Sequence, residues 1–283
     1  MEISVITVNR NDRNGLKKTI ESVVRQRVAP YEFIIIDGGS DDGSTDEIRA
    51  AGENVTCWVS EPDGGIYNAM NKGIERATGE WCLFLNSGDT FCDDGVIARI
   101  CESGATADII CGNAVIQEKT PWRKVPPEKI TLGFLFGGSL CHQSALIRTS
   151  LLKRHRYDEG LKIVADRKFF LQSLIFDNCS YSRINVDIAD YDITGYSARN
   201  RFASEQEYIG VLEDLIPQRI LEDYGKERRG ALFGASPYEK MFLEIGRRKW
   251  RGPVYRWVRT AIGAAAAIWP SATFIKRFPK REK

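Results

Sequence analysis

Apolar residues over the first 90 positions follow two periods, one typical of strands and one typical of helices. Runs rich in apolar and β-branched residues at 3–8, 33–36 and 81–85 are long enough to form buried strands. Apolar residues at 16–24 and 66–77 recur instead at the spacing of a helix face. Buried strands that alternate with helices indicate a mainly parallel sheet with helices on both faces. The pattern therefore predicts an α/β fold.

Side chains that can cap helices mark where several helices are expected to begin. Asn14 is available to cap the first of them. Ser44 and Glu47 have the spacing of a capping box, in which each side chain bonds to the other residue's backbone, and Ser204 and Glu207 repeat that spacing. We therefore expect three helix starts at these sites.

The pattern changes after the first half of the chain. Residues 113–139 contain three prolines and are expected to form a long irregular connection beside a cleft. Helix periodicity returns at 165–175, and beyond Pro217 basic residues are interleaved with aromatic ones. The expected division is a domain over 1–205, made of halves 1–112 and 113–205, and a helical, basic extension over 206–283.

Composition narrows the class of protein. The 283 residues are 43% hydrophobic and 28% charged, as in soluble globular proteins, and the net charge of +2 is too small to indicate nucleic acid as a partner. The seven cysteines are odd in number and form no Cys-x-x-Cys pair, so buried reduced thiols are expected rather than disulfides or a zinc site. The first residues lack the apolar segment of a secretory signal, and we expect a cytoplasmic protein.

Polar clusters follow three of the predicted strands, at 7–9, 37–40 and 86–89. Ligands of open parallel sheets bind beyond the carboxyl ends of the strands, so we expect Thr7 and Asn9 to share one site with the two later clusters. Turn formation alone explains any single cluster. Three clusters at one edge of a sheet favour a binding site.

The chemistry of these clusters suits a nucleotide. Asp37 is a candidate acceptor for donors on a base or ribose, and Gly38 lets the backbone approach a ligand closely. Asp89 follows a buried strand and is a candidate ligand for Mg²⁺ or Mn²⁺, ions that often take one or two carboxylates together with phosphate oxygens.

Three segments carry a family resemblance. IIIDGGSDDGS at 34–44 and SEPDGGIYNAMNKGI at 60–74 resemble successive blocks of the family-2 glycosyltransferases, and FLNSGD at 84–89 stands where that family has its Asp-x-Asp metal motif. The likeness covers roughly residues 3–196 in order and spacing. It implies a GT-A, Rossmann-like fold, a nucleotide-activated sugar donor and a divalent metal, Mn²⁺ or Mg²⁺. It also points to enzymes that make bacterial surface polysaccharides.

The resemblance also suggests roles on the donor side. Asp63 stands where the family faces the nucleotide or the donor sugar, although capping the following helix is a compatible role. Asn71, in that helix, is included among the donor-binding residues. Asn86 and Gly88 replace acidic residues of the usual metal motif, which leaves Asp89 as the only carboxylate there. We expect weaker metal affinity, with Asn86 helping to place the diphosphate.

On the acceptor side, Asp166 resembles the acidic residue that heads the family's acceptor helix. Inverting transfer needs a general base for the acceptor hydroxyl, and we expect burial to raise the pKa of Asp166 toward neutrality. The alternative is an Asp favoured at a helix N-terminus by the macrodipole. His142 falls in a block similar to the family's His-Gln segment beside the acceptor, and a core histidine that donates to a backbone carbonyl is equally open.

These observations predict an inverting glycosyltransferase that uses a nucleoside-diphosphate sugar, with UDP as the default nucleotide, and a glycan or lipid-linked acceptor. The alternative is a non-catalytic nucleotide- or glycan-binding module with the same fold. A nucleotidyltransferase would need a basic, Gly-rich loop after the first strand, and a dinucleotide-dependent dehydrogenase would need Gly-x-Gly-x-x-Gly at the same place. Residues 9–12 read NRND, which argues against both classes. The basic, aromatic tail suits packing on the domain or contact with the inner face of the cell membrane, and we expect the second.

Overall fold

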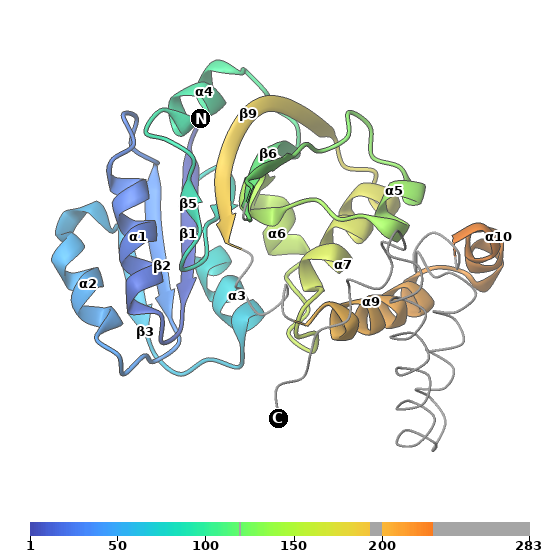
Figure 1. Cartoon of the computed structure of the whole chain (residues 1–283), viewed down its shortest axis with the longest axis horizontal. Helices are drawn as coiled ribbons and strands as arrows, with labels where there is room; N and C mark the ends of the chain where they lie inside the picture. Colours follow the sequence, from blue (N-terminus) through green and yellow to red (C-terminus); the bar gives the residue numbers. More distant parts are fainter. Residues whose placement is uncertain (119, 193–199, 229–283) are drawn as a thin grey trace, which may run out of the picture. The chain divides into compact units, whose positions relative to one another are not determined.

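The computed structural model describes residues 1–118, 120–192 and 200–228. Residues Met1–Leu221 form one compact unit, and a second begins at Glu222. The expected basic tail, from residue 229 onward, lies outside the described residues. Within Met1–Leu221 the strands form one sheet in the order β3-β2-β1-β4-β8-β6-β9-β5, with β7 paired to β6 (Figure 1).

The first half of the sheet is parallel. Its strands are β1 (Ile3–Asn9), β2 (Glu32–Asp37), β3 (Cys57–Ser60) and β4 (Trp81–Phe84). β1 pairs in parallel with β2 and β4, and β2 with β3. Every residue of β1 and β4 is buried, as expected for strands covered on both faces. The predicted parallel α/β sheet is confirmed here.

The second half of the sheet is mixed. Its strands are β5 (Thr90–Phe91), β6 (Ile109–Gln117), β7 (Trp122–Lys124), β8 (Ala145–Arg148) and β9 (Tyr181–Asp192). β8 runs antiparallel between β4 and β6, whereas the long, curved β9 runs parallel to β6 and carries β5 on its other side (Figure 1).

The connection expected to be irregular over 113–139 is in part regular, so that prediction was wrong in part. It includes the end of β6, the short β7 and helix α5 (Leu132–Gly137). Its three prolines lie outside the paired residues, with Pro121 before β7 and the other two after it. Proline is compatible with such strand-flanking positions, because no ladder hydrogen bond is lost there.

The helices and short helical turns follow the strands along the chain. They are α1 (Arg13–Val24), α2 (Ser44–Ala51), η1 (Gly52–Asn54), α3 (Ile66–Arg76), α4 (Val96–Glu102), η2 (His142–Ser144), α6 (Thr149–Arg154), α7 (Ala165–Leu171), the π-helical turn η3 (Gln172–Phe176), α9 (Arg201–Leu215) and α10 (Gln218–Arg228). The helix predicted over 165–175 is confirmed as α7 and η3.

Helices cover both faces of the parallel half. Successive residues of a strand point to opposite faces, and Val5 of β1 joins the apolar cluster that includes Leu16 of α1 and Ile97 of α4. Ile6 faces the other way, and a Cβ on Gly73 of α3 would lie 2.5 Å from its Cγ2 atom. α1 and α4 therefore cover one face and α3 packs closely on the other.

The first helix starts differ from the predicted caps. Asp12, not Asn14, caps α1, because its Oδ1 accepts from the backbone N of Gly15 (3.0 Å). Ser44 and Glu47 form no capping box, since α2 has no side-chain cap from Gly43. The carboxylate of Glu47 instead binds Arg13 of α1, with its Oε1 2.6 Å from Nη2. The carboxylate of Glu47 is therefore engaged in a tertiary ion pair and does not cap the helix.

The second predicted capping box, Ser204 with Glu207, is also wrong. α9 begins at Arg201 after Asn200, so Ser204 lies inside the helix. The carboxylate of Glu207 accepts hydrogen bonds from backbone N–H groups of residues 162–164, more than 40 residues earlier in the chain.

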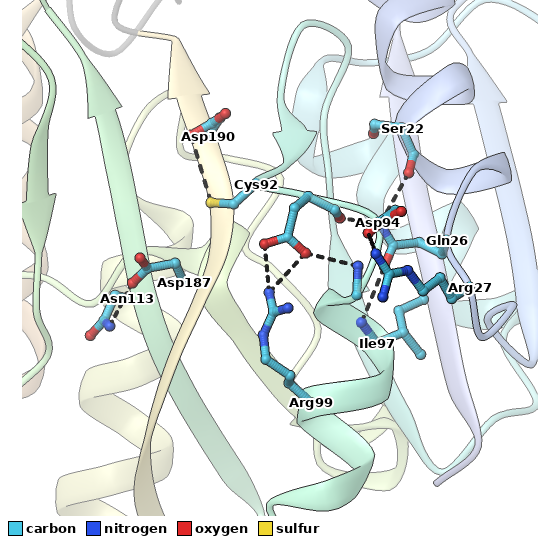
Figure 2. A network of polar contacts seen from close by, with 12 residues as sticks. Ser22, Gln26, Arg27, Cys92, Asp94, Ile97, Arg99, Asn113, Asp187 and Asp190 are labelled. Carbon is cyan, nitrogen blue, oxygen red and sulfur yellow. Dashed lines mark hydrogen bonds and ion pairs between the residues drawn. The ribbon is translucent and has the colours of Figure 1, made fainter.

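A network of polar contacts fixes the segment that follows Asp89 (Figure 2). Gln26 donates from Nε2 to the backbone oxygen of Asp93 (2.5 Å) and accepts from the backbone N of Ile97 (3.2 Å). Arg99 forms two hydrogen bonds with Asp93, of 2.8 and 2.9 Å. These contacts anchor the turn between β5 and α4 to the end of α1.

All seven cysteines are free, but only Cys82 and Cys111 are buried and the other five are partly exposed, so the prediction of buried thiols was wrong in part. Over the described ranges, no helix combines the length and the apolar character needed to cross a bilayer.

Candidate active site

The polar clusters after β1, β2 and β4 converge at one edge of the sheet, as the sequence predicts. Asn9, at the end of β1, is the link between them. Its Nδ2 donates to Oδ1 of Asp37 (2.7 Å), and its Oδ1 accepts from the hydroxyl of Ser87 (2.8 Å). Its backbone oxygen accepts from the N of Gly38 (2.8 Å). One buried side chain thus holds three strand ends together.

Asp37 is fully buried, and its two oxygens are occupied by protein donors. Oδ1 accepts from Asn9 and from the hydroxyl of Ser40 (2.6 Å), while Oδ2 accepts from the N of Ser40 (2.9 Å) and the hydroxyl of Ser60 (2.6 Å). Burial alone would raise the pKa of Asp37, but the hydrogen bonds from Ser40 and Ser60 outweigh it and lower the pKa below its ordinary value. Asp37 therefore shapes the turn as an ionised acceptor, and a base or ribose would have to displace one of these donors.

Gly38 and Asp63 meet directly. A Cβ at Gly38 would lie 2.4 Å from Oδ2 of Asp63, so only glycine leaves room for this carboxylate. Oδ1 of Asp63 accepts from the N of Gly65 (2.9 Å) just before α3, and it lies 3.8 Å from Nη1 of Arg10. Gly65, not Asp63, is the N-cap residue of α3, and no side chain caps that helix, so the predicted capping role of Asp63 was wrong. The carboxylate of Asp63 instead lies beside the strand-end cluster at Gly38.

Two predicted donor-binding residues occupy other surroundings. Thr7 is fully buried inside β1, two residues before the strand ends. Asn71 is also buried, and its side chain bonds to the backbone N and O of Tyr157 (3.0 and 2.8 Å) and to Oε1 of Glu159 (2.8 Å). The structure therefore does not bring Thr7 to the open edge, and it makes Asn71 the anchor of the loop between α6 and α7.

A second group of side chains brings four elements together. Nδ1 of His142 in η2 lies 3.2 Å from Oδ2 of Asp166 in the first turn of α7. Nε2 of the same ring lies 3.3 Å from Nδ2 of Asn86, just after β4. The hydroxyl of Tyr67 in α3 makes a longer contact, 3.4 Å, with Oδ1 of Asp166. His142 therefore joins the donor-side loop to the predicted base.

The pKa of Asp166 differs in direction from the expectation. Burial, the largest single influence, raises it, but the hydrogen bond and charge of His142 together with the backbone hydrogen bond and charge of Arg167 lower it by more. The net pKa is below its ordinary value, so the prediction of a pKa raised toward neutrality was wrong. The side chains of Asp166 and His142 are each 15% exposed, which leaves the carboxylate reachable yet ionised.

Asp89 stands at the same edge as Asn86. It is buried, and its backbone N donates to the backbone oxygen of Asn86 (2.9 Å). Burial raises the pKa of the Cys141 thiol beside η2, and the charge of Asp89 adds to this. Among the residues that the structure describes, no three His, Cys, Asp or Glu side chains could hold one metal ion together. Oδ1 of Asn86 is a buried oxygen with no hydrogen-bond partner. One carboxylate and one amide oxygen fit Mg²⁺ or Mn²⁺ if donor phosphates complete the shell.

Comparison with known proteins decides the family. Residues 4–175 match the family model described as glycosyl transferase family 2. The chain belongs to glycosyl transferase family 2. An uncharacterized glycosyltransferase of Mycobacterium tuberculosis is 30% identical over 267 residues, which cover 87% of this chain and 98% of that one.

Solved structures agree with this glycosyltransferase fold. S. aureus TarS 1–349 in complex with UDP-GlcNAc has a TM-score of 0.64 at 17% identity, covering 87% of this chain and 76% of that chain. This chain spans 44% of a longer TarS chain. The mannosyltransferase PcManGT from Pyrobaculum calidifontis, in complex with GDP-Man and Mn²⁺, has a TM-score of 0.62 at 17% identity, covering 97% and 83%. The fold is GT-A, as predicted.

Sequence reasoning missed three residues of this glycosyltransferase site. Ser60 binds Asp37 and Tyr67 contacts Asp166, and both lie within the 60–74 block that carries the family resemblance. Glu207 had been taken for a local cap, and no short-range signal distinguishes its contact with residues 162–164 from a capping box.

Proposed function

We propose that this protein is an inverting glycosyltransferase that moves a sugar from a nucleoside-diphosphate sugar to a hydroxyl of a glycan or a lipid-linked acceptor. The observation that carries the proposal is the contact of Asp166 with His142, whose ring also meets Asn86 on the donor side. An ionised, partly buried carboxylate lies where donor and acceptor halves of the sheet meet. That arrangement suits a general base.

In the proposed reaction, Asp166 accepts the proton of the acceptor hydroxyl while that oxygen attacks the anomeric carbon of the donor. The bond from the anomeric carbon to the diphosphate breaks, and its electron pair leaves with the diphosphate. A single displacement inverts the anomeric centre and forms no covalent enzyme intermediate. His142 holds Asp166 by the contact of Nδ1 with Oδ2. Oδ1, which has only the longer contact of 3.4 Å with the hydroxyl of Tyr67, would accept the proton.

Asp89 would hold the divalent metal, Mn²⁺ or Mg²⁺, with Asn86 nearby to help place the diphosphate. When bound, such an ion neutralises charge that develops on the leaving diphosphate. The complex of PcManGT with GDP-Man and Mn²⁺ supports metal use by a protein of the same fold. The single carboxylate of this chain favours a weakly held ion.

The donor nucleotide is proposed to be UDP, with GDP as the competing choice. TarS in complex with UDP-GlcNAc supports the first, and PcManGT in complex with GDP-Man supports the second. A hexosyl donor is consistent with both. The nucleotide side of the site would be formed by Asn9, Asp37, Gly38 and Asp63. Asp37 would act there by fixing the turn with its hydrogen bonds.

The acceptor is proposed to belong to polysaccharide biosynthesis in a bacterium, at the cytoplasmic face of the cell membrane. The sequence blocks at 34–44 and 60–74 and the basic, aromatic tail support this assignment. We also propose the domain organisation predicted from the sequence. It consists of a domain with halves 1–112 and 113–205 and a helical extension over 206–283.

The second candidate function is a non-catalytic nucleotide- or glycan-binding module, which the single carboxylate of the metal motif favours. The following test separates an enzyme from such a module. Wild type and Asp166→Asn are compared for sugar transfer and for thermal shifts with UDP, GDP, dTDP and CMP, each with and without Mn²⁺. We expect Asp166→Asn to lose about 10²- to 10⁴-fold in kcat, because a general base contributes that much, while nucleotide affinity is unchanged. The matched control is Asp214→Asn, an exposed position on α9.

Each result has a clear meaning. Full turnover by Asp166→Asn would remove Asp166 from the mechanism. Nucleotide binding without any turnover by the wild type would favour the binding module. Nucleotide shifts that ignore Mn²⁺ would remove Asp89 as a metal ligand.

A further inference from the structure

α9 touches the segment that carries the proposed base. Glu207 accepts from the backbone N of Lys162 at Oε1 (2.7 Å) and from those of Ile163 and Val164 at Oε2 (2.8 and 3.0 Å). One carboxylate therefore binds three consecutive N–H groups. Such charge-assisted hydrogen bonds are shorter and stronger than neutral ones, so this contact fixes the backbone path of the segment.

That segment leads directly into Asp166. Val164 is the residue before α7 and provides no side-chain cap of its own, and Asp166 follows it by two positions. A helix start without a local cap depends on other partners for its N–H groups. Glu207 supplies the hydrogen bonds just before α7 from another part of the chain, so the direction in which α7 presents Asp166 depends on α9.

The residue after the base is held by the same helix. The guanidinium of Arg167 stacks on the ring of Tyr208, 3.4 Å from its centroid, and its Nη1 lies 3.2 Å from Oε1 of Glu205. The hydroxyl of Tyr208 donates to the backbone oxygen of Leu135 in α5 (2.7 Å). α9 thus binds the chain on both sides of Asp166 and also the helix that follows the β7 connection.

We propose that Glu207 is a positioning residue for Asp166, and that it acts with Glu205 and Tyr208 of α9 to hold the chain on both sides of this base. The proposal rests on the proposed function, because it assigns Glu207 the task of orienting the general base. Within the described residues, the hydrogen bonds of Glu207 are with the backbone of 162–164, and none joins it to a donor-side residue. Its removal should therefore change kcat and leave donor binding intact.

The test is Glu207→Gln in the full-length chain, assayed for kcat, donor KM and nucleotide affinity. The substitution keeps the shape but turns one acceptor oxygen into an N–H donor that faces backbone N–H groups. We expect kcat to fall about 10- to 100-fold, the range that a displacement of a catalytic group by roughly 1 Å produces. Donor KM and nucleotide affinity should stay within about twofold of wild type. Glu213→Gln, an exposed position on the same helix, is the matched control and should leave kcat unchanged.

A double variant separates positioning from a general structural role. If Glu207 acts through Asp166, adding Glu207→Gln to Asp166→Asn causes no further loss, because the group being positioned is already absent. A loss that multiplies in the double variant would overturn the proposal. So would a wild-type kcat in Glu207→Gln, or a fall in kcat that is matched by a fall in nucleotide affinity.

Two further comparisons keep the test decisive. Full turnover by Asp166→Asn alone would defeat the proposed function itself, whereas loss in Asp166→Asn with wild-type turnover in Glu207→Gln would defeat only the positioning role. If Glu207→Gln does not fold, Glu205→Gln tests the same helix through Arg167. It should lower kcat a few-fold at unchanged nucleotide affinity, and an unchanged kcat would overturn the proposal.

Discussion

His142 and Asp166 face each other with Nδ1 3.2 Å from Oδ2, and the charges around them set the working pH of the proposed base. Burial raises the pKa of Asp166, and His142 and Arg167 together lower it by more. Tyr67 from α3 and Arg167 from α7 face the same carboxylate, and the charge of Arg167 also lowers its pKa. A base must be deprotonated, so activity is lost as pH falls through its pKa. The wild type should therefore stay active to low pH.

Replacing His142 by Gln should move the acidic limb of the kcat/KM profile to higher pH, because burial still raises the pKa of Asp166 and the lowering by His142 is lost. The profile is measured between pH 4 and 9 with buffers of constant ionic strength. His155→Gln is the control, because that ring contacts Asp177 and not Asp166. Profiles of His142→Gln and wild type that overlay would contradict this account.

Single side chains also show where sequence reasoning succeeds and where it stops. Asn9, Asp37 and Asp63 were recognised because each stands next to a strand end or a helix start, which are local signals. The direction of the pKa of Asp166 could not be predicted, because it depends on His142, which is 24 residues earlier and reaches Asp166 only in the folded chain.

Helix packing supplies a prediction on stability. Gly73 lies in α3 against β1, and a Cβ there would lie 2.5 Å from Cγ2 of the buried Ile6. Gly73→Ala should destabilise the protein by about 1–3 kcal/mol through overpacking. Gly210, inside α9, has open space around its Cα, so Gly210→Ala should stabilise by about 0.5–1 kcal/mol through helix propensity. Urea denaturation of the two variants measures both signs.

Gly73→Ala and Gly210→Ala each add one methyl group to a helix, yet we expect their effects on stability to have opposite signs. A Gly73→Ala variant as stable as wild type would mean that α3 can move away from β1. A destabilised Gly210→Ala variant would mean that α9 has a neighbour at that position.

The elements themselves were predictable where their signals are local. β1 and β4 of the parallel half are buried on both faces, so their apolar runs predicted them. β5 has only two residues and depends on the distant strand β9, whose Asp190 pairs with Thr90. β7 has three residues, too few to show a strand period, although it pairs with β6 directly before it. The capping boxes failed for a related reason, because Glu47 and Glu207 bind groups elsewhere in the fold.

For the whole chain, the basic and aromatic tail predicts contact with an anionic membrane surface. Residues from 247 onward include Arg247, Arg248, Lys249, Trp250 and Arg251. A chain that ends at residue 228 should bind vesicles containing anionic lipid at least about tenfold more weakly than the full chain, because each basic residue near the surface contributes roughly 1 kcal/mol. Cosedimentation with these vesicles at low and high salt measures this difference. Screening of charges by salt should weaken vesicle binding by the full chain but not by the shortened chain.

The shortened chain keeps every proposed site residue, including Glu207, so its turnover with a water-soluble acceptor should equal that of the full chain. Equal vesicle binding by the two chains would remove the tail from membrane contact. Neutral vesicles serve as the control for hydrophobic adsorption.

The long separation between α9 and the segment that it braces has a consequence for biosynthesis. Lys162 and Glu207 are 45 residues apart in the chain. A protein is made from its N-terminus, and early parts of it can fold while later parts are still being added. We therefore expect a growing chain to gain its nucleotide-binding edge first and a correctly aimed base only after α9 has left the ribosome. The growing chain would then be able to bind the donor before it is able to transfer the sugar.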